Sequence, residues 1–166
     1  MRRLTVFACA VAATIAAKPA LAQSVPEKMP FDIPYGMPIS YADASKLIDA
    51  AAAEAKKHDW KMNIAVVDPN GDLIAFQRMD GAQIASVAIS QGKARTAARY
   101  RRATEVFFKA FESGHPYLAT LDPTLVASPG GIPLVRDGKL IGAIGCSGGT
   151  GDQDAVVCKA GADSLK

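Results

Sequence analysis

The chain has 166 residues and a formal net charge of +3, and 49% of its residues are hydrophobic. This length accommodates one domain with a real core and excludes a second. Residues 1–22 carry three of the 19 basic side chains and none of the 16 acidic ones, so the remaining chain is formally neutral. A neutral chain argues against a nucleic-acid partner, which requires a clustered positive face. The only local exception is the arginine cluster Arg95, Arg99, Arg101 and Arg102.

Residues 1–22 have the pattern of a cleaved secretory signal peptide. Arg2 and Arg3 precede an apolar stretch, and Ala20-Leu21-Ala22 supplies the small-x-small pattern at which signal peptidases cut. The stretch is shorter than the about 20 residues that a membrane-spanning helix needs. Cys9 comes too early to follow a hydrophobic region, which argues against a lipoprotein anchor. We therefore expect a periplasmic or secreted protein without a stable membrane anchor.

The segment that follows, residues 23–38, repeats proline every four residues and predicts an extended arm that is disordered or lies across a neighbouring subunit. Ser40 and Asp43 then have the spacing of a helix start. Apolar residues recur at intervals of three and four from there to about His58, which predicts a helix with one buried face.

Two hairpins and three further helices are expected after this helix. An Asn-Gly turn joins residues 62–67 to residues 73–78, and an Asp-Gly turn joins the two apolar runs between Gly130 and Gly149. Helices are predicted from Ile84 to about Tyr100, from Ala103 to Ser113, and from about Gln153. Because hairpins imply antiparallel strands and the helices are grouped between them, the sequence predicts an α+β fold.

Two cysteines lie beyond the signal peptide. Cys146 is expected at a strand end and Cys158 inside the final helix, so a disulfide requires that helix to fold back over the hairpin. An oxidising compartment favours this pairing, and two buried thiols are the alternative. The chain has no Cys/His spacing typical of a metal site.

Five short motifs, in this order, resemble the GlcG/HbpS family of heme-binding proteins, which is related to the C-terminal domain of PduO-type proteins. They are residues 78–82, residues 90–97, residues 130–133, residues 138–145, and residues 147–149 with the acidic residues at 152 and 154. The similarity extends from about Ile39 to the end of the chain, so residues 39–166 are expected to form the GlcG/HbpS-like domain. At position 146 the resemblance implies a small apolar residue, and this chain has a cysteine instead. The cysteine brings thiol redox chemistry into consideration.

The resemblance implies a profilin-like fold with a central antiparallel sheet of about five strands, flanked by helices and assembled into dimers to octamers. It also implies heme binding, and heme degradation or redox sensing in some members. We therefore expect a binding protein rather than an enzyme, with heme or a related tetrapyrrole as its ligand.

A heme site needs an apolar slot, donors for two propionates and usually an axial ligand. His115, in a loop after Gly114, is the candidate axial ligand, whereas His58 at a helix end is expected to have a capping role. Met62, Met79, Tyr100 and Tyr117 are interpreted as packing residues.

Polar residues spaced three apart on one helix suggest a second binding surface. Ser90, Lys93 and Thr96 sweep across one side of the helix and can point toward the glycine loops. They could form an anion-binding wall for a propionate or another carboxylate, with backbone N–H donors at Gly130, Gly131, Gly148 and Gly149. The alternative is that the hydroxyls bond within their own helix and that Lys93 is solvated or pairs with Asp80.

The alternative function is an enzyme or accessory factor that acts on a carboxylated metabolite at this Ser90/Lys93/glycine-loop cleft. A serine hydrolase is excluded, although residues 145–149 match G-x-S-x-G, because no histidine follows Ser147.

Overall fold

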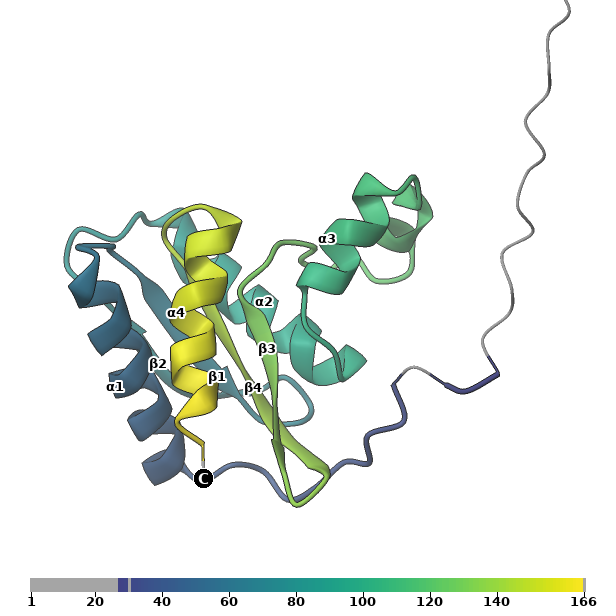
Figure 1. The fold of residues 1–166 in the computed structure, drawn as a ribbon, viewed down its shortest axis with the longest axis horizontal. Helices are drawn as coiled ribbons and strands as arrows, with labels where there is room; N and C mark the ends of the chain where they lie inside the picture. The colour runs from purple at the N-terminus through teal and green to yellow at the C-terminus, as the bar shows by residue number, and fades with distance from the viewer. Residues whose placement is uncertain (1–26, 30, 166) are drawn as a thin grey trace, which may run out of the picture.

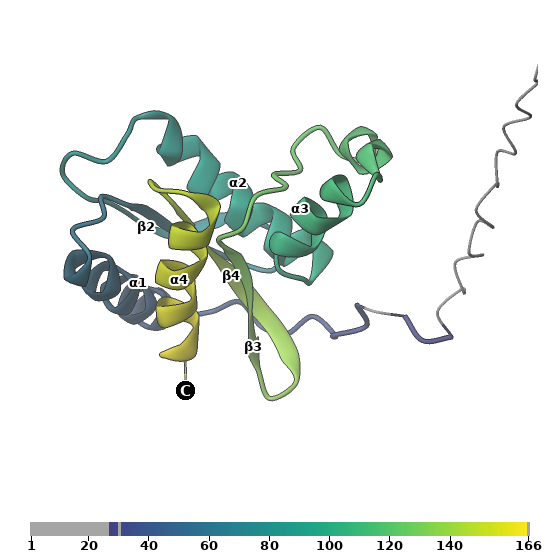
Figure 2. The ribbon, with the colours of Figure 1, turned by 45° about the horizontal axis from the view of Figure 1, so that its top comes forward.

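The computed structural model describes residues 27–29 and 31–165. The expected signal peptide, residues 1–22, lies outside the described residues, as do residues 23–26 of the expected arm. The described chain forms a sheet covered by helices on both faces, and one helical segment projects away from it (Figures 1 and 2). The elements are α1 (Tyr41–Lys57), β1 (Asn63–Val67), β2 (Leu73–Arg78), α2 (Ala85–Tyr100), α3 (Glu105–Glu112), the 3-10 helix η1 (Pro116–Thr120), β3 (Gly131–Arg136), β4 (Lys139–Ser147) and α4 (Gly151–Asp163).

The sheet is antiparallel with the strand order β2-β1-β4-β3. It is built from the two hairpins that the sequence predicts, joined through the pairing of β1 with β4. The α+β fold with an antiparallel sheet flanked by helices is therefore confirmed. The expectation of about five strands is wrong, because the described residues form a sheet of four strands.

Alternation along β1 separates the two faces of the sheet. Ile64 and Val66 pack in a core cluster with α1 and α4, whereas Ala65 and Val67 pack in a second cluster with α2. Successive side chains of a strand point to opposite faces, so one fully buried strand serves both layers. The small residues on the α2 side allow that helix to lie close to the sheet.

Helix α1 begins as its sequence predicts. The side chain of Ser40 accepts a hydrogen bond from the backbone N–H of Asp43 at 3.1 Å, which satisfies one of the free donors at the helix start. Leu47, Ile48 and Ala51 are buried on the face that meets the sheet and α4. The helix ends at Lys57, and the capping residue His58 stacks on Trp60 with 4.3 Å between ring centroids.

The described part of the N-terminal arm lies against its own domain. The backbone N–H of Leu140 donates to the carbonyl of Pro34 at 2.8 Å, and the N–H of Gly36 donates to the carbonyl of Leu140 at 2.7 Å. The N–H of Ile39 donates to the carbonyl of Ile141 at 2.8 Å. Residues 34–39 therefore run alongside the first residues of β4.

A disulfide joins Cys146 at the end of β4 to Cys158 in α4, with their Cα atoms 5.5 Å apart. Both residues are fully buried. The fold-back of the last helix that pairing requires is therefore present, and the alternative of two free thiols is wrong. The link ties α4 to the centre of the sheet.

Gly145 in β4 is required by the close approach of α2. A Cβ atom at this position would meet the carbonyl oxygen of Ser90 and the backbone nitrogen of Ala94, and neither is the end of a flexible side chain. The glycine of the family motif therefore has a packing role at this position.

We expect Gly145→Ala to destabilise the fold by about 1–3 kcal/mol, because the added methyl group must push α2 away from the sheet. Urea unfolding followed by circular dichroism measures the change. An unchanged midpoint would mean that α2 can move away without loss of packing.

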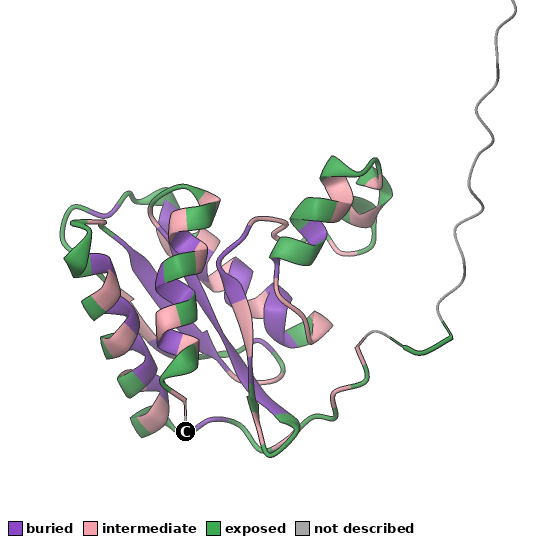
Figure 3. Ribbon diagram, in the orientation of Figure 1, coloured by how far each residue is buried: buried purple, intermediate pink, exposed green. Residues whose placement is uncertain are grey.

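The segment formed by α3 and η1 projects beyond the sheet (Figure 1). Much of its surface is exposed or half-buried (Figure 3), and Phe107 is the one fully buried side chain among the residues of α3. Among the helices of residues 27–29 and 31–165, none is long and apolar enough to cross a membrane.

Candidate functional site

The glycine-rich loop after β4 already binds an anion, and that anion belongs to the chain itself. Asp154 in the first turns of α4 accepts a hydrogen bond from the backbone N–H of Gly149 at 3.0 Å. Gly148 lies within the same loop, packed against the backbone of Lys61. Thr150 caps α4 in a reciprocal arrangement with Gln153. Of the four glycines expected to donate to a bound carboxylate, Gly148 and Gly149 thus face Asp154.

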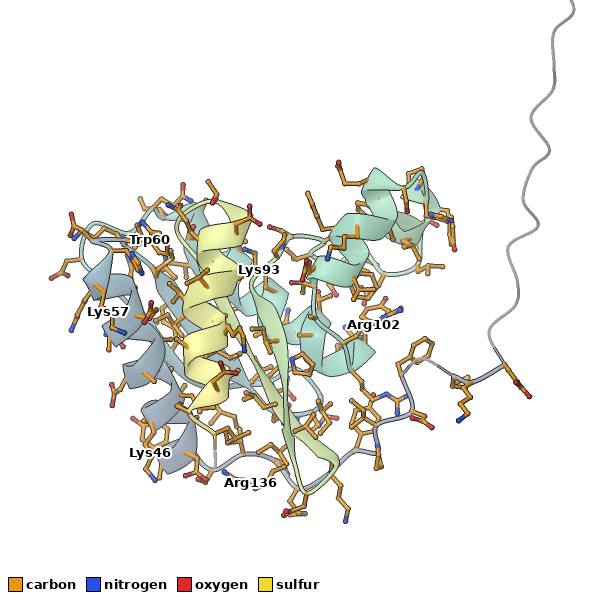
Figure 4. All side chains as sticks on the ribbon, in the orientation of Figure 1. Lys46, Lys57, Trp60, Lys93, Arg102 and Arg136 are labelled. Carbon is orange, nitrogen blue, oxygen red and sulfur yellow. A yellow bond between two sulfur atoms is a disulfide. The ribbon has the colours of Figure 1, made fainter. Side chains whose placement is uncertain are left out.

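Lys93 forms a buried ion pair with the same carboxylate. Its Nζ atom lies 2.6 Å from Oδ2 of Asp154, and the two side chains are 1% and 3% exposed. Because α2 and α4 cover opposite faces of the sheet, the pair crosses between the two layers, and Figure 4 shows Lys93 in the interior. The partner of Lys93 is Asp154, so the alternatives of a solvated side chain or a pair with Asp80 are wrong.

Burial shifts the pKa of both members of this pair against ionisation. Desolvation lowers the pKa of Lys93 and raises the pKa of Asp154, and each shift is opposed by the hydrogen bond and the charge of the other residue. The positive charge of Lys93 is therefore already matched within the fold.

The other residues of the expected anion-binding wall are also bonded within the protein. Ser90 donates to the carbonyl of Val87 at 3.2 Å, which is the local bonding considered above. Thr96 accepts from the backbone N–H of Val126 at 3.0 Å. All three wall residues are buried, so the helix face that carries them points into the core.

Gly130 and Gly131 join the start of β3 to its neighbours. Gly130 accepts from the N–H of Cys146 at 2.8 Å, and Gly131 donates to the hydroxyl of Thr104 at 2.9 Å. A hollow of about 250 Å³ lies beside them, between β3, α4 and the start of α3. This volume is smaller than the roughly 300–1,000 Å³ of sites that enclose drug-sized ligands. The hollow alone is therefore too small to enclose a heme.

His115 is half-buried in the turn between α3 and η1. Its Nδ1 atom lies 3.1 Å from the hydroxyl of Ser113, which donates to the carbonyl of Ala110 at 3.0 Å. The hydroxyl has one proton, and when this proton is given to the carbonyl, it is Nδ1–H of His115 that donates to Ser113. This tautomer leaves a lone pair on Nε2, and no hydrogen bond to Nε2 is found among the described residues.

This arrangement of His115 suits a metal ligand. A ligating imidazole usually donates its second ring nitrogen to a fixed acceptor, which sets the tautomer and orients the ring. Tyr117 adds an edge-to-face contact with 6.1 Å between ring centroids. By contrast, Nε2 of His58 lies 3.2 Å from Glu54, and the ring is stacked on Trp60, in agreement with a role at the end of α1.

The projecting segment around His115 exposes large apolar side chains. Val106, Phe108, Tyr117 and Leu121 are each between 42% and 62% exposed. Where such side chains form a contiguous patch, they mark places where ligands or partners bind.

Sequence reasoning also missed the environment of Arg102. The guanidinium carbon of this residue lies 4.7 Å from the ring centroid of Phe31 and 4.6 Å from that of Phe107. Its Nε atom is buried and has no hydrogen-bond partner. The only sequence signal was the local excess of arginines, which does not distinguish one arginine from another.

No group of three or more His, Cys, Asp or Glu side chains that could hold a metal ion occurs in the described part of the chain.

Comparisons with known proteins agree with the motifs found in the sequence. A family model described as haem degrading protein HbpS-like matches residues 39–163. Protein GlcG of Escherichia coli strain K12 is 45% identical over 109 residues, which cover 66% of this chain and 81% of GlcG. A double mutant of HbpS from Streptomyces reticuli superposes with a TM-score of 0.73 at 28% identity, covering 89% of this chain and 99% of that one. A crystal structure of a PduOC:heme complex also gives a TM-score of 0.73 at 28% identity, covering 78% and 96% of the two chains.

Proposed function

The chain belongs to the HbpS-like family, and from that premise we propose that it binds heme, with His115 as the axial ligand of the iron. The observation that carries this proposal is the 3.1 Å contact between Nδ1 of His115 and the hydroxyl of Ser113, which holds the ring and leaves Nε2 without a hydrogen-bond partner among the described residues. The neighbouring apolar side chains of α3 and η1 supply a surface suited to a porphyrin face.

The heme, when bound, would supply a redox-active iron whose behaviour depends on its axial ligand and its exposure to solvent. His115 would donate the lone pair of Nε2, and Ser113 would keep the ring oriented. Since the described chain exposes this apolar surface and does not enclose it, we propose that a second copy of the chain covers the other face of the ligand.

The finer expectations from the sequence remain proposals. The chain would work as a periplasmic or secreted homo-oligomer, from dimer to octamer, with a profilin-like fold and a role in heme handling or redox sensing. The buried disulfide supports an oxidising compartment, because such bonds are rare in reducing ones. The alternative function, a carboxylate cleft at Ser90 and Lys93, loses its support because Asp154 already pairs with the lysine.

A hemin titration of the chain from Gln23 onward, followed by absorbance, tests this proposal. We expect a saturable Soret shift for the unsubstituted protein and an affinity weakened on the order of 10-fold or more in His115→Ala, because the iron loses its axial nitrogen.

His58→Ala is the matched control, because it removes a histidine that pairs with Glu54 and stacks on Trp60. It should bind hemin with unchanged affinity. A protein that gives no saturable shift in either the oxidised or the reduced state of the iron would defeat the heme proposal. An unchanged His115→Ala titration would defeat the assignment of the ligand.

A further inference from the structure

We propose that Arg102 recognises a carboxylate of the bound ligand, a propionate if the ligand is heme. This inference rests on the proposed function for the identity of the ligand. The site itself is defined by the fold. It is the guanidinium of Arg102, which lies against the rings of Phe31 and Phe107.

Arg102 carries a charge that the fold does not match. Its Nε atom is buried without a partner, and no carboxylate of the described residues lies within ion-pair distance of its guanidinium. Burial lowers the pKa of this guanidinium, which reflects the loss of hydration around the charge. The two aromatic rings offset part of that loss through their negative faces, but they accept no conventional hydrogen bond.

The neighbouring arginines are satisfied within the chain. Arg99 lies 3.5 Å from the carboxylate of Asp122 and 3.4 Å from the hydroxyl of Thr124. Arg101 donates to the carbonyl of Ile33 at 2.9 Å and also lies over the ring of Tyr35. The same short stretch of sequence therefore provides partners for two arginines and leaves Arg102 without one.

The chemistry of this site favours a carboxylate. A guanidinium presents its N–H donors as a planar fork that matches the two oxygens of a carboxylate. The rings of Phe31 and Phe107 restrict the movement of the side chain, so less rotamer entropy is lost when an anion binds. Figure 4 shows Arg102 below α3, near the point where the N-terminal arm approaches the domain.

The position of Arg102 relates it to the proposed iron ligand. Arg102 precedes α3 and His115 follows it, so one helix of eight residues joins the two positions. Such a helix is about 12 Å long. A ligand that carries a metal-binding centre and, some distance from it, a carboxylate would have matching groups at both ends of this segment.

Two ligands that differ only in their carboxylates test the proposal. Hemin carries two free propionates, and hemin dimethyl ester carries none that can ionise. We expect the unsubstituted protein to bind hemin more tightly than the ester, and Arg102→Gln to weaken hemin binding on the order of 10- to 100-fold while the affinity for the ester stays unchanged. The preference for hemin should therefore disappear in the variant.

Arg101→Gln is the matched control, since it removes the adjacent guanidinium, whose donor is already used by Ile33. It should keep the preference for hemin, and the thermal midpoints of both variants, followed by circular dichroism, report whether they are folded. Equal weakening of both ligands in Arg102→Gln would show that Arg102 only packs the arm, and would overturn the inference. Equal affinity of the unsubstituted protein for both ligands would overturn it while leaving the heme proposal intact. Failure to bind either ligand would overturn both.

Discussion

Lys93→Ala is expected to destabilise the protein by about 3–5 kcal/mol, as is typical when one partner of a buried ion pair is removed. The substitution leaves the carboxylate of Asp154 buried, with only the backbone N–H groups of Gly148 and Gly149 as hydrogen-bond donors among the described residues. The carboxylate cannot reach water to recover its solvation, because its side chain is 3% exposed. Urea unfolding of the variant and of the unsubstituted protein measures the difference.

The double variant Lys93→Met/Asp154→Leu distinguishes the cost of an unpaired charge from the value of the pair itself. Replacing both members by apolar side chains of similar size is expected to be neutral or stabilising, since neither residue then buries a charge. Lys159→Ala is the exposed control, because both members of its pair with Asp163 are more than 60% exposed. A Lys93→Ala protein as stable as the Lys159→Ala protein would mean that Asp154 finds a new partner or takes up a proton at little cost.

The same substitution separates the two functions considered from the sequence. A carboxylate cleft at Ser90 and Lys93 would lose its ligand in Lys93→Ala and keep its fold. If the buried ion pair is the role of Lys93, the Lys93→Ala variant should instead lose stability, because Lys93 faces Asp154 and not solvent. Stability and hemin affinity are therefore to be measured on the same preparations.

The sequence predicted the local structure of this chain well for physical reasons that act over a few residues. The cap at Ser40, the turns of the two hairpins and the end of α2 at Tyr100 depend on neighbours within four positions. The faces of the helices were also predicted from their periodicity, and Ser90, Lys93 and Thr96 do share one side of α2.

The sequence could not determine what that side of α2 faces. Lys93 and Asp154 are 61 residues apart, and their contact depends on how α2 and α4 pack on opposite faces of the sheet. A lysine in a helix is usually exposed to solvent, so the sequence pattern alone predicts an exposed side chain for Lys93, which is wrong. The aromatic contacts of Arg102 were missed for the same reason, because Phe31 lies in an arm that has no periodic pattern.

Removal of the disulfide by Cys146→Ala/Cys158→Ala is expected to destabilise the protein by about 3 kcal/mol. The two cysteines are 12 residues apart, and chain entropy predicts about that value for a closed loop of this length. The bond fixes α4 to β4, and α4 also carries Asp154 of the buried ion pair. Without the bond, the unfolded chain gains conformational entropy in the segment between the two cysteines. Guanidinium unfolding of the double variant, compared with the unsubstituted protein, gives the difference in free energy.

Dithiothreitol provides the matched comparison for this prediction. It should lower the unfolding midpoint of the unsubstituted protein toward that of the double variant and leave the double variant unchanged. Because both sulfur atoms belong to fully buried residues, reduction should require opening of α4 and proceed slowly in the native state. Rapid reduction without loss of stability would contradict a structural role, and the bond would then belong among the labile disulfides that respond to the redox state of their surroundings.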